Sequence, residues 1–205
     1  MPKEVYYLSD TDVPEPIQFL RDIKIVHKRR VWWRFMKKYN IQSVCEVGVF
    51  ESQNFRRMIE SGPKIAVGVD LWMRDGNPAV NDSDFSQGKL EEQYHYFLSI
   101  MKENPFVRLC RQYSVDAAKN FPDEYFDLIY IDGDHTYEGC KQDLEAWWPK
   151  VKKGGFFTGD DYSDRCAPRT GIEFGVIKAV NEFGKINNLP IYELTRYGWV
   201  IIKQL

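Results

Sequence analysis

The sequence has no excess of charge of one sign and no long run of like charges. Among its 205 residues, 28 lysines and arginines stand against 30 aspartates and glutamates, which leaves a formal net charge of −2. Proteins that hold nucleic acids by their phosphates usually carry a basic face or tail. We therefore expect no nucleic-acid partner.

Long apolar segments and closely spaced cysteines are also missing. No stretch approaches the ~20 apolar residues of a membrane-crossing helix, and Met1–Glu4 does not open a signal peptide. We expect no membrane partner and a cytoplasmic location. The four cysteines, at positions 45, 110, 140 and 166, lie far apart. Buried free thiols are therefore expected, rather than disulfides or a zinc site.

What the sequence does contain is a regular alternation of apolar runs and helix-like segments. A chain of 205 residues is enough for one domain with a sizeable core, and the alternation predicts a doubly wound, Rossmann-like α/β sheet. Two closing runs joined by a short turn require one antiparallel strand. The expected strands are 43–48, 65–70, 106–110, 126–131, 156–159, 191–195 and 199–203, and the expected helices are 53–61, 90–102, 115–121, 137–151 and 171–188.

Two further segments flank this pattern. Residues 1–40 are expected to form a helical extension packed on the sheet, and residues 41–205 form the main domain. The aromatic, basic stretch Lys28–Met36 fits either a nucleic-acid or membrane contact or a solvated helix face, and we favour the second. The polar section Arg74–Lys89 is too long for an ordinary connection and predicts a lid or substrate loop.

The segment Phe126–His135 carries the strongest indication of chemistry. Its apolar run has no polar alternation, which is typical of a parallel strand covered on both faces. The run ends in Asp132, Asp134 and His135, and ligands of such sheets bind at the carboxyl ends of the strands. We expect Asp132 and His135 in the site, with Asp134 capping the next helix.

Several strand-end motifs in this order resemble those of class I S-adenosylmethionine-dependent methyltransferases. They are Glu46-Val47-Gly48, Asp70, Ser114, Phe126–His135, and Gly154-Gly155 with Asp160-Asp161. The resemblance covers about residues 43–203 and is strongest to metal-dependent O-methyltransferases of the catechol and macrolide-sugar types. It implies a seven-stranded sheet whose last strand is antiparallel, which agrees with the closing hairpin.

The loop after the first strand favours S-adenosylmethionine over a dinucleotide. A pyrophosphate needs a glycine-rich turn, whereas Gly48–Ser52 has one glycine, and Glu51 would repel phosphate. S-adenosylmethionine has no phosphate, and its cationic groups tolerate Glu46. The resemblance implies that Gly48 lets the backbone approach the methionine part, that Ser52 replaces a second glycine, and that Asn54 meets the carboxylate. It also implies that Asp70 binds the ribose, Ser114 borders the adenine and Trp72 lines the pocket, with Glu46 and Asp132 completing the expected cofactor-binding set.

Three carboxylates at neighbouring strand ends suggest a metal site. Asp132, Asp160 and Asp161 would repel one another when partly buried, and a hard divalent cation such as Mg²⁺, Mn²⁺ or Ca²⁺ would resolve that repulsion. In the metal-dependent O-methyltransferases the matching positions are metal ligands. The alternative is that Asp160 and Asp161 only start the next loop through side-chain turns.

The reaction predicted from the resemblance is O-methylation of a small hydroxylated acceptor, such as a sugar, natural product or catechol. The cation would lower the hydroxyl pKa, and His135 would remove the proton. Catechol-type enzymes place a lysine at this position, so the base stays open; His95 is a substitute, and His27 fits a surface residue. A homodimer is compatible with the sequence.

Two other functions remain open. The first is a metal-independent methyltransferase that acts on nitrogen or on a macromolecule. The second is a non-catalytic α/β domain that binds a nucleoside-like ligand. An NAD-linked oxidoreductase is disfavoured because the phosphate turn is missing.

Overall fold

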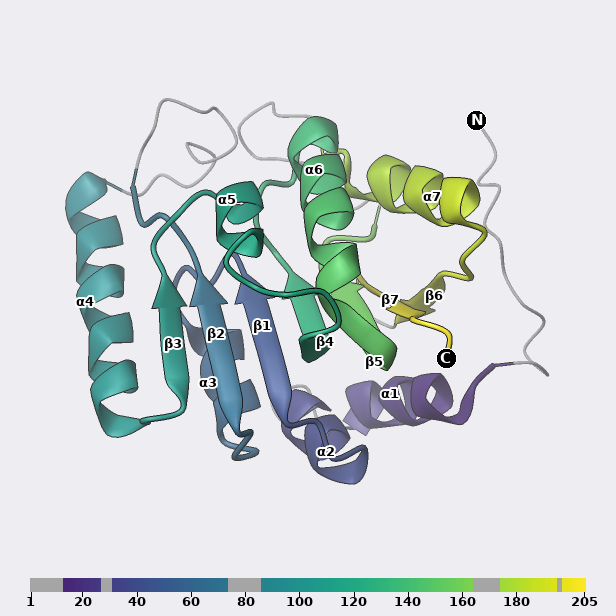
Figure 1. Cartoon of the computed structure of the whole chain (residues 1–205), viewed down its shortest axis with the longest axis horizontal. Coiled ribbons are helices and arrows are strands. Elements are labelled where there is room, and N and C mark those ends of the chain that lie inside the picture. Colours follow the sequence, from purple (N-terminus) through teal and green to yellow (C-terminus); the bar gives the residue numbers. More distant parts are fainter. Residues whose placement is uncertain (1–12, 27–30, 74–85, 164–173, 195–196) are drawn as a thin grey trace.

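A mixed seven-stranded sheet forms the centre of the computed structural model, which describes residues 13–26, 31–73, 86–163, 174–194 and 197–205 (Figure 1). The strand order is β3-β2-β1-β4-β5-β7-β6. Strands β1 to β5 pair in parallel, and β7 runs antiparallel to both β5 and β6. The predicted fold class, with its antiparallel last strand, is confirmed. The strands are β1 Ser43–Val47, β2 Ile65–Val69, β3 Val107–Cys110, β4 Phe126–Ile131, β5 Val151–Gly159, β6 Tyr192–Leu194 and β7 Gly198–Ile202.

Helices cover both faces of this sheet. Apolar side chains of α1 to α4 share one core cluster with the sheet, and those of α5 to α7 share the other. In Figure 1, α5 and α6 lie in front of the sheet and α3 lies behind it. The helices are α1 Glu15–Val26, α2 Val31–Lys38, α3 Gln53–Ile59, α4 Gln87–Glu103, α5 Ser114–Ala118, α6 Tyr137–Trp147 and α7 Val176–Asn187.

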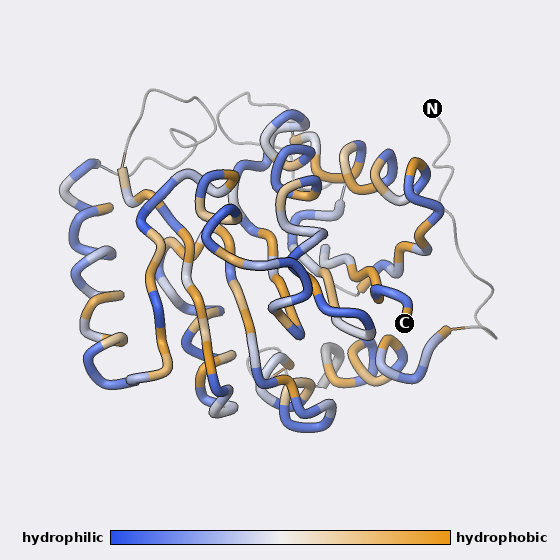
Figure 2. Tube along the Cα trace, in the orientation of Figure 1, coloured by the Kyte–Doolittle hydropathy of each residue, from blue (hydrophilic) through white to orange (hydrophobic). Residues whose placement is uncertain are grey.

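Strand β4 shows why residues 128–131 form an apolar run without polar alternation. Leu128 and Tyr130 belong to the cluster on one face, and Ile129 and Ile131 belong to the cluster on the other. Since successive side chains of a strand point to opposite faces, a strand buried on both sides cannot alternate apolar with polar. Figure 2 shows apolar colour along the central strands and two-coloured helices around them.

The sequence misplaced the boundary between α6 and β5. The helix expected to reach Val151 ends at Trp147, a 3₁₀ turn η3 follows at Trp148–Lys150, and β5 begins at Val151. Pro149 is the physical reason, because proline lacks the N–H that a continuing α-helix needs and restricts the residue before it. The two glycines expected to end the helix, Gly154 and Gly155, lie instead within β5, where the register against β4 shifts.

Helices α1 and α2 share a core cluster with the sheet. Trp32 is buried and contacts Tyr130 of β4 edge to face, with ring centroids 5.3 Å apart. This tryptophan is therefore part of the core rather than of a ligand surface. The basic residues 28–30 lie outside the described residues, and the division into an extension and a main domain stays a prediction.

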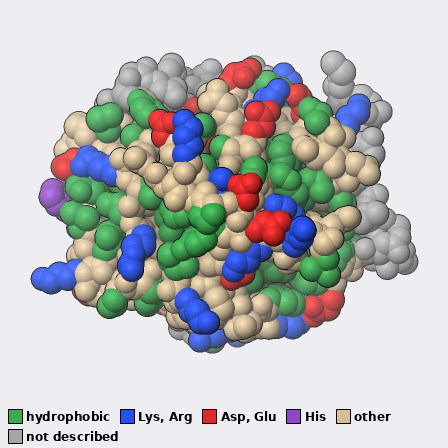
Figure 3. Space-filling view, viewed as in Figure 1, with side chains coloured by type: hydrophobic (Ala, Val, Ile, Leu, Met, Phe, Trp, Pro, Cys, Tyr) green, Lys and Arg blue, Asp and Glu red, His purple; other side chains and the backbone are tan. Residues whose placement is uncertain are grey.

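The structure describes three of the four cysteines. Cys45 and Cys140 are buried free thiols and Cys110 is a half-buried one, whereas position 166 is not described. Most of the expected lid, residues 74–85, is also not described. No helix in the described part of the chain is long and apolar enough to span a bilayer. On the face seen in Figure 3, acidic and basic side chains are interspersed.

Candidate active site at the carboxyl ends of the parallel strands

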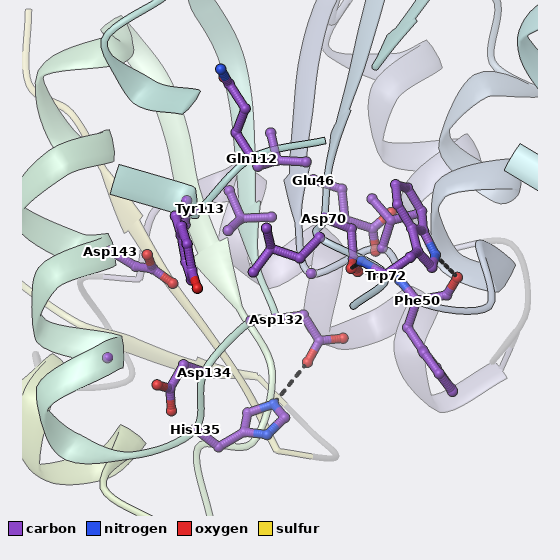
Figure 4. A pocket seen from close by; sticks show the side chains of 18 of the residues that line it. Glu46, Phe50, Asp70, Trp72, Gln112, Tyr113, Asp132, Asp134, His135 and Asp143 are labelled. Atoms are coloured by element: carbon purple, nitrogen blue, oxygen red, sulfur yellow. Dashed lines mark hydrogen bonds and ion pairs between the residues drawn. The ribbon is translucent and has the colours of Figure 1, made fainter. Parts of the chain in front are cut away.

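A cavity of about 840 Å³ opens where strands β1, β2 and β4 end. Its wall includes the predicted residues Glu46, Gly48, Asn54, Asp70, Trp72, Ser114, Asp132 and His135. Figure 4 shows Glu46, Asp70 and Trp72 on one side, Tyr113 and Asp143 on the other, and Asp132 with His135 between them. The volume is typical of a pocket for a small molecule.

Gly48 lets the ends of β1 and β4 meet. Its φ is +81°, and a Cβ added there would lie 1.9 Å from the carbonyl oxygen of Asp132. Only glycine adopts this conformation without strain and allows so close an approach. The sequence predicted that Gly48 makes room for a cofactor; in the structure, its missing side chain makes room for the backbone that carries Asp132.

Glu46 is a buried carboxyl with one unused oxygen. Oε1 accepts a hydrogen bond from Asn54 Nδ2 at 2.9 Å, and Oε2 has no partner among the described residues. Burial, together with the nearby carboxylates of Asp132 and Asp70, raises the pKa of Glu46 well above its usual value. A cationic ligand in the cavity would satisfy Oε2 and relieve this repulsion. Asn54, expected to meet a ligand carboxylate, lines the cavity and donates to Glu46.

Asp70 and Trp72 shape the turn after β2. Asp70 accepts hydrogen bonds from the backbone N–H groups of Phe50 and Trp72, both at 2.8 Å. Burial raises the pKa of Asp70, and these backbone donors partly offset that rise. The Trp72 indole is almost fully buried and donates from Nε1 to the Phe50 carbonyl oxygen at 2.9 Å. Trp72 therefore supports the cavity wall through the two loops that it joins.

The two predicted serines occupy helix starts. Ser52 precedes α3 in a left-handed conformation, with φ of 60°, and its buried hydroxyl has no partner among the described residues. Ser114 begins α5, and its hydroxyl accepts a hydrogen bond from Trp147 Nε1 at 2.8 Å. Ser114 lines the cavity, whereas Ser52 is not among the residues that line it.

Asp132, His135 and Asp161 form a compact cluster beside the cavity. His135 Nε2 lies 3.3 Å from Asp132 Oδ1 and 3.0 Å from Asp161 Oδ2. The imidazole stacks on Phe174, with ring centroids 4.9 Å apart and planes 9° apart. Burial alone would lower the pKa of His135, but the two carboxylates outweigh it and raise the pKa to about 10. The ring is therefore an imidazolium at neutral pH.

The predicted metal ligands come together in part. Among the described residues, one group of potential ligands has all its ligand atoms within 4.8 Å of one another, and it consists of Asp132, His135 and Asp161. Asp160 follows β5 directly and lies outside this group. His135, which the sequence assigned to proton removal, is thus the third member of this group.

Residues 54–162, more than half of the chain, match the family model described as a methyltransferase domain. The chain belongs to this methyltransferase family. Together with the fold, this membership confirms the class I S-adenosylmethionine-dependent type that the strand-end motifs predicted.

Individual relatives of this chain are distant. An uncharacterized protein of Acanthamoeba polyphaga mimivirus is 35% identical over 144 residues, which are 67% of this chain and 57% of the viral one. The structure of the O-methyltransferase NovP has a TM-score of 0.63 and 18% identity, over 89% of this chain and 81% of that one. An SAH-bound methyltransferase of Podospora anserina has a TM-score of 0.57 and 11% identity, over 94% and 89%. The chain thus spans little more than half of the curated relative, and the two structures support the fold alone.

The sequence also assigned roles to His95, His27 and Asp134. His95 is exposed on α4 and lies 3.6 Å from Glu91, so it is a surface residue. His27 lies outside the described residues. The cap of α6 is Thr136, whose hydroxyl accepts from the Gly139 N–H, and not Asp134. Asp134 accepts from the N–H of Thr136 two residues on, because that spacing favours an Asx turn.

The sequence reasoning missed Asp143 and Phe174. Asp143 lies on α6, is buried and lines the cavity. A signal for it existed, because Cys140, Asp143, Leu144 and Trp147 share the helical spacing of a core-facing stripe. A carboxylate in such a stripe requires an explanation. Phe174 gave no such signal, since only the tertiary fold brings it to His135.

Proposed function

We propose that this methyltransferase moves a methyl group from S-adenosylmethionine to a hydroxyl oxygen of a small acceptor, with the help of a divalent cation. The observation that carries the proposal is an acidic cavity bordered by the Asp132, His135 and Asp161 cluster. The acceptor class is a sugar, natural product or catechol-like compound with neighbouring oxygens. The acceptor and the cation dependence rest on the sequence motifs and on this geometry.

The cavity residues fit S-adenosylmethionine, which supplies the sulfonium methyl when bound. Its ammonium and sulfonium groups are positively charged and would pair with Glu46 Oε2, which has no hydrogen-bond partner among the described residues. Glu46, Asp70 and Asp132 make the wall acidic, and this wall would disfavour a phosphate-bearing dinucleotide. The orphaned buried oxygen is the decisive part of this fit, because a buried carboxyl without a partner is costly.

The cluster also fits a cation. Neighbouring ligands of an octahedral ion with bonds of about 2.1 Å lie about 3.0 Å apart, and His135 Nε2 is 3.3 Å and 3.0 Å from the two carboxylate oxygens. Two carboxylates with one imidazole suit Mn²⁺ at least as well as Mg²⁺, because Mg²⁺ prefers oxygen. When bound, the cation would lower the pKa of an acceptor hydroxyl.

The chain's own residues then have separate roles. As an imidazolium, His135 has no free lone pair for an incoming proton, so we propose that it holds the two carboxylates together rather than acting as the base. To ligate the cation, His135 would first give up its Nε2 proton and become a neutral imidazole. Phe174 fixes the plane of its ring. Asp132 borders the cavity and is the carboxylate that we propose receives the hydroxyl proton.

One observation favours a second candidate. The positive charge of His135 already balances the neighbouring carboxylates without any metal, so a metal-independent methyltransferase acting on nitrogen or on a macromolecule is the runner-up. No comparable observation supports a non-catalytic nucleoside-binding domain, because the cluster of Asp132, His135 and Asp161 would have no role in such a domain.

Calorimetry and methyl transfer from labelled S-adenosylmethionine test the proposal. We expect the full chain to bind the cofactor with or without Mn²⁺ or Mg²⁺, and to methylate acceptors with neighbouring hydroxyls only when a cation is present. Asp132→Asn should abolish transfer. Asp116→Asn, which changes an exposed carboxylate paired with Lys119, is the matched control. Undiminished transfer in EDTA would favour the runner-up, and no cofactor binding would refute both.

A further inference from the structure

Tyr130 of β4 is a buried phenol near the reaction centre that none of the roles above uses. Its side chain is 6% exposed, and its ring packs edge to face on Trp32 with ring centroids 5.3 Å apart. A buried phenolic hydroxyl usually has a hydrogen-bond partner. No described residue forms a hydrogen bond with the Tyr130 hydroxyl. The hydroxyl therefore has a hydrogen to donate to a group that the described part of the chain does not supply.

The Tyr130 hydroxyl is not sealed inside the core. Among the described residues, three side-chain atoms are fully buried without a partner, and they are Glu46 Oε2, Ser52 Oγ and Trp199 Nε1. The Tyr130 oxygen also has no partner, yet it is not one of these three atoms. Part of its surface therefore stays accessible, and a ligand can reach it.

The pairing of the strands places Tyr130 next to the acidic strand ends. Tyr130 pairs with Glu46 of β1 and with Thr158 of β5. Asp132 lies two residues after Tyr130, and Asp160 lies two residues after Thr158. The backbone N–H groups of both aspartates still donate to the neighbouring strands, so the alternation of the strands extends to them. Since side chains two residues apart on a strand point to the same face, both carboxylates lie on the face of Tyr130.

The neighbouring carboxylates keep this hydroxyl protonated. Burial raises the pKa of Tyr130 well above its usual value, and the charges of Asp160, Asp132 and Glu46 raise it further. Tyr130 is therefore a neutral phenol at every pH at which the protein is folded and active. A phenol donates a hydrogen to an oxygen atom, whereas ionised carboxylates only accept one. Tyr130 thus adds a donor to a set of acceptors.

The position of Tyr130 matches the acceptor rather than the cofactor. Asp132 lines the cavity and Tyr130 does not. Residues of α5 and α6 line the cavity, whereas Tyr130 belongs to the core cluster of α1 to α4 on the opposite face of the sheet. Methyl transfer needs an acceptor oxygen that is in line with the sulfonium methyl and points away from the cofactor. With the cofactor in the cavity, an acceptor beside Asp132 meets Tyr130.

We propose that Tyr130 is a specificity-determining residue of the acceptor site, where its hydroxyl donates a hydrogen bond to the oxygen next to the one that is methylated. This inference rests on the proposed function, because it takes an acceptor with neighbouring hydroxyls as the ligand. Such an acceptor presents one oxygen to Asp132 and the other to Tyr130. Trp32 holds the phenol ring in place and does not touch the acceptor.

The test compares acceptors that have two neighbouring hydroxyls with counterparts that have one. Catechol and phenol form an aromatic pair, and cyclohexane-1,2-diol and cyclohexanol form a sugar-like pair. We measure kcat/KM for methyl transfer from labelled S-adenosylmethionine to each compound. Tyr130→Phe keeps the ring and removes only the hydroxyl. It should lower kcat/KM for the diol about 3-fold to 10-fold, as expected for one hydrogen bond between neutral groups, and leave the value for the mono-alcohol unchanged.

Tyr192→Phe is the matched control. Tyr192 is 5% exposed and belongs to the same core cluster, but it lies on β6, three strands and about 14 Å from Tyr130. This variant should retain both values of kcat/KM. Both variants should keep the wild-type affinity for S-adenosylhomocysteine in calorimetry and the wild-type free energy of unfolding in urea.

The outcomes separate this inference from the proposed function. If Tyr130→Phe methylates the diol as well as the wild type does, the inference is overturned. An equal loss for the diol and the mono-alcohol also overturns it, because a structural role, or one exerted through Asp132, would affect both compounds alike. If the wild type binds S-adenosylmethionine but methylates none of the four compounds, the proposed acceptor class fails first and the inference fails with it.

Discussion

Replacing Gly48 with alanine should separate the two strand ends that carry the reaction centre. The new Cβ would lie 1.9 Å from the Asp132 carbonyl oxygen, 2.4 Å from its carbonyl carbon and 2.7 Å from Gly133 Cα. Real Cβ contacts are not shorter than about 3.0 Å, so the two backbones must move apart by about 1.1 Å. Both are tied to the sheet, because the Gly48 N–H donates to Val69 and the Asp132 N–H donates to Val47.

Two physical costs combine at this position. Alanine at φ of +81° costs about 1–2 kcal/mol relative to glycine, and forcing extra volume into packed structure costs about 1–3 kcal/mol more. We therefore expect Gly48→Ala to lower the free energy of unfolding by about 2–5 kcal/mol, measured by urea denaturation. Because Asp132 moves with the backbone, affinity for S-adenosylhomocysteine should fall as well.

Gly62 provides the matched control for the backbone cost. It has a similar φ of +71°, and a Cβ there would meet nothing within 4 Å. Gly62→Ala should therefore cost only about 1–2 kcal/mol and leave ligand affinity unchanged. If the two alanine variants lose equal stability, the close contact between β1 and β4 is not as tight as the structure describes, and the steric argument is refuted.

Three other changes have defined outcomes. Burial alone would raise the pKa of Asp127, but the Lys152 ammonium and backbone N–H groups lower it, so Asp127→Asn should cost about 1–3 kcal/mol at pH 7. The Asp127 carboxylate stabilises the fold at pH values above its unfolded-state pKa of about 3.9, and this stabilisation is lost as the pH falls below that value. If Asp127→Asn still lowers the free energy of unfolding by the same amount in urea titrations at pH 2, the carboxylate is not the source of the effect. Trp72→Phe removes the indole hydrogen bond to Phe50 and should cost about 1 kcal/mol by the same assay; an unchanged stability contradicts it. Asp161→Asn should weaken Mn²⁺ binding about 10-fold or more in electron paramagnetic resonance titrations, whereas equal affinity would remove Asp161 from the ligand set.

Most of the fold could be predicted from the sequence. Apolar runs such as Leu128–Ile131 indicated parallel strands buried on both faces, and the closing turn at Tyr197-Gly198 indicated the antiparallel strand. The ends of helices and strands were predicted less accurately, as the end of α6 shows. The apolar pattern continues past Trp147 and predicted a longer helix, whereas Pro149 ends the helix in the structure. Local sequence offers several endings for such a helix, and the pairing of β5 with β4 selects one.

The sequence placed several cavity-lining residues correctly, but it did not predict their partners. The sequence placed Glu46, Asp70 and Asp132 at strand ends, where the structure has them. It could not tell that Asn54 donates a hydrogen bond to Glu46. It also could not tell that His135, rather than Asp160, joins Asp132 and Asp161.

The sequence by itself determined the order of strands and helices, the family, and which edge of the sheet holds the acidic residues. These features depend on apolar periodicity and on residues that lie close along the chain. The tertiary structure alone decided which side chains meet across the cavity, such as His135 with Asp161 and Ser114 with Asp143. Hydrogen bonds act over about 3 Å, and the course of loops between separate strands sets such distances, which no local pattern records.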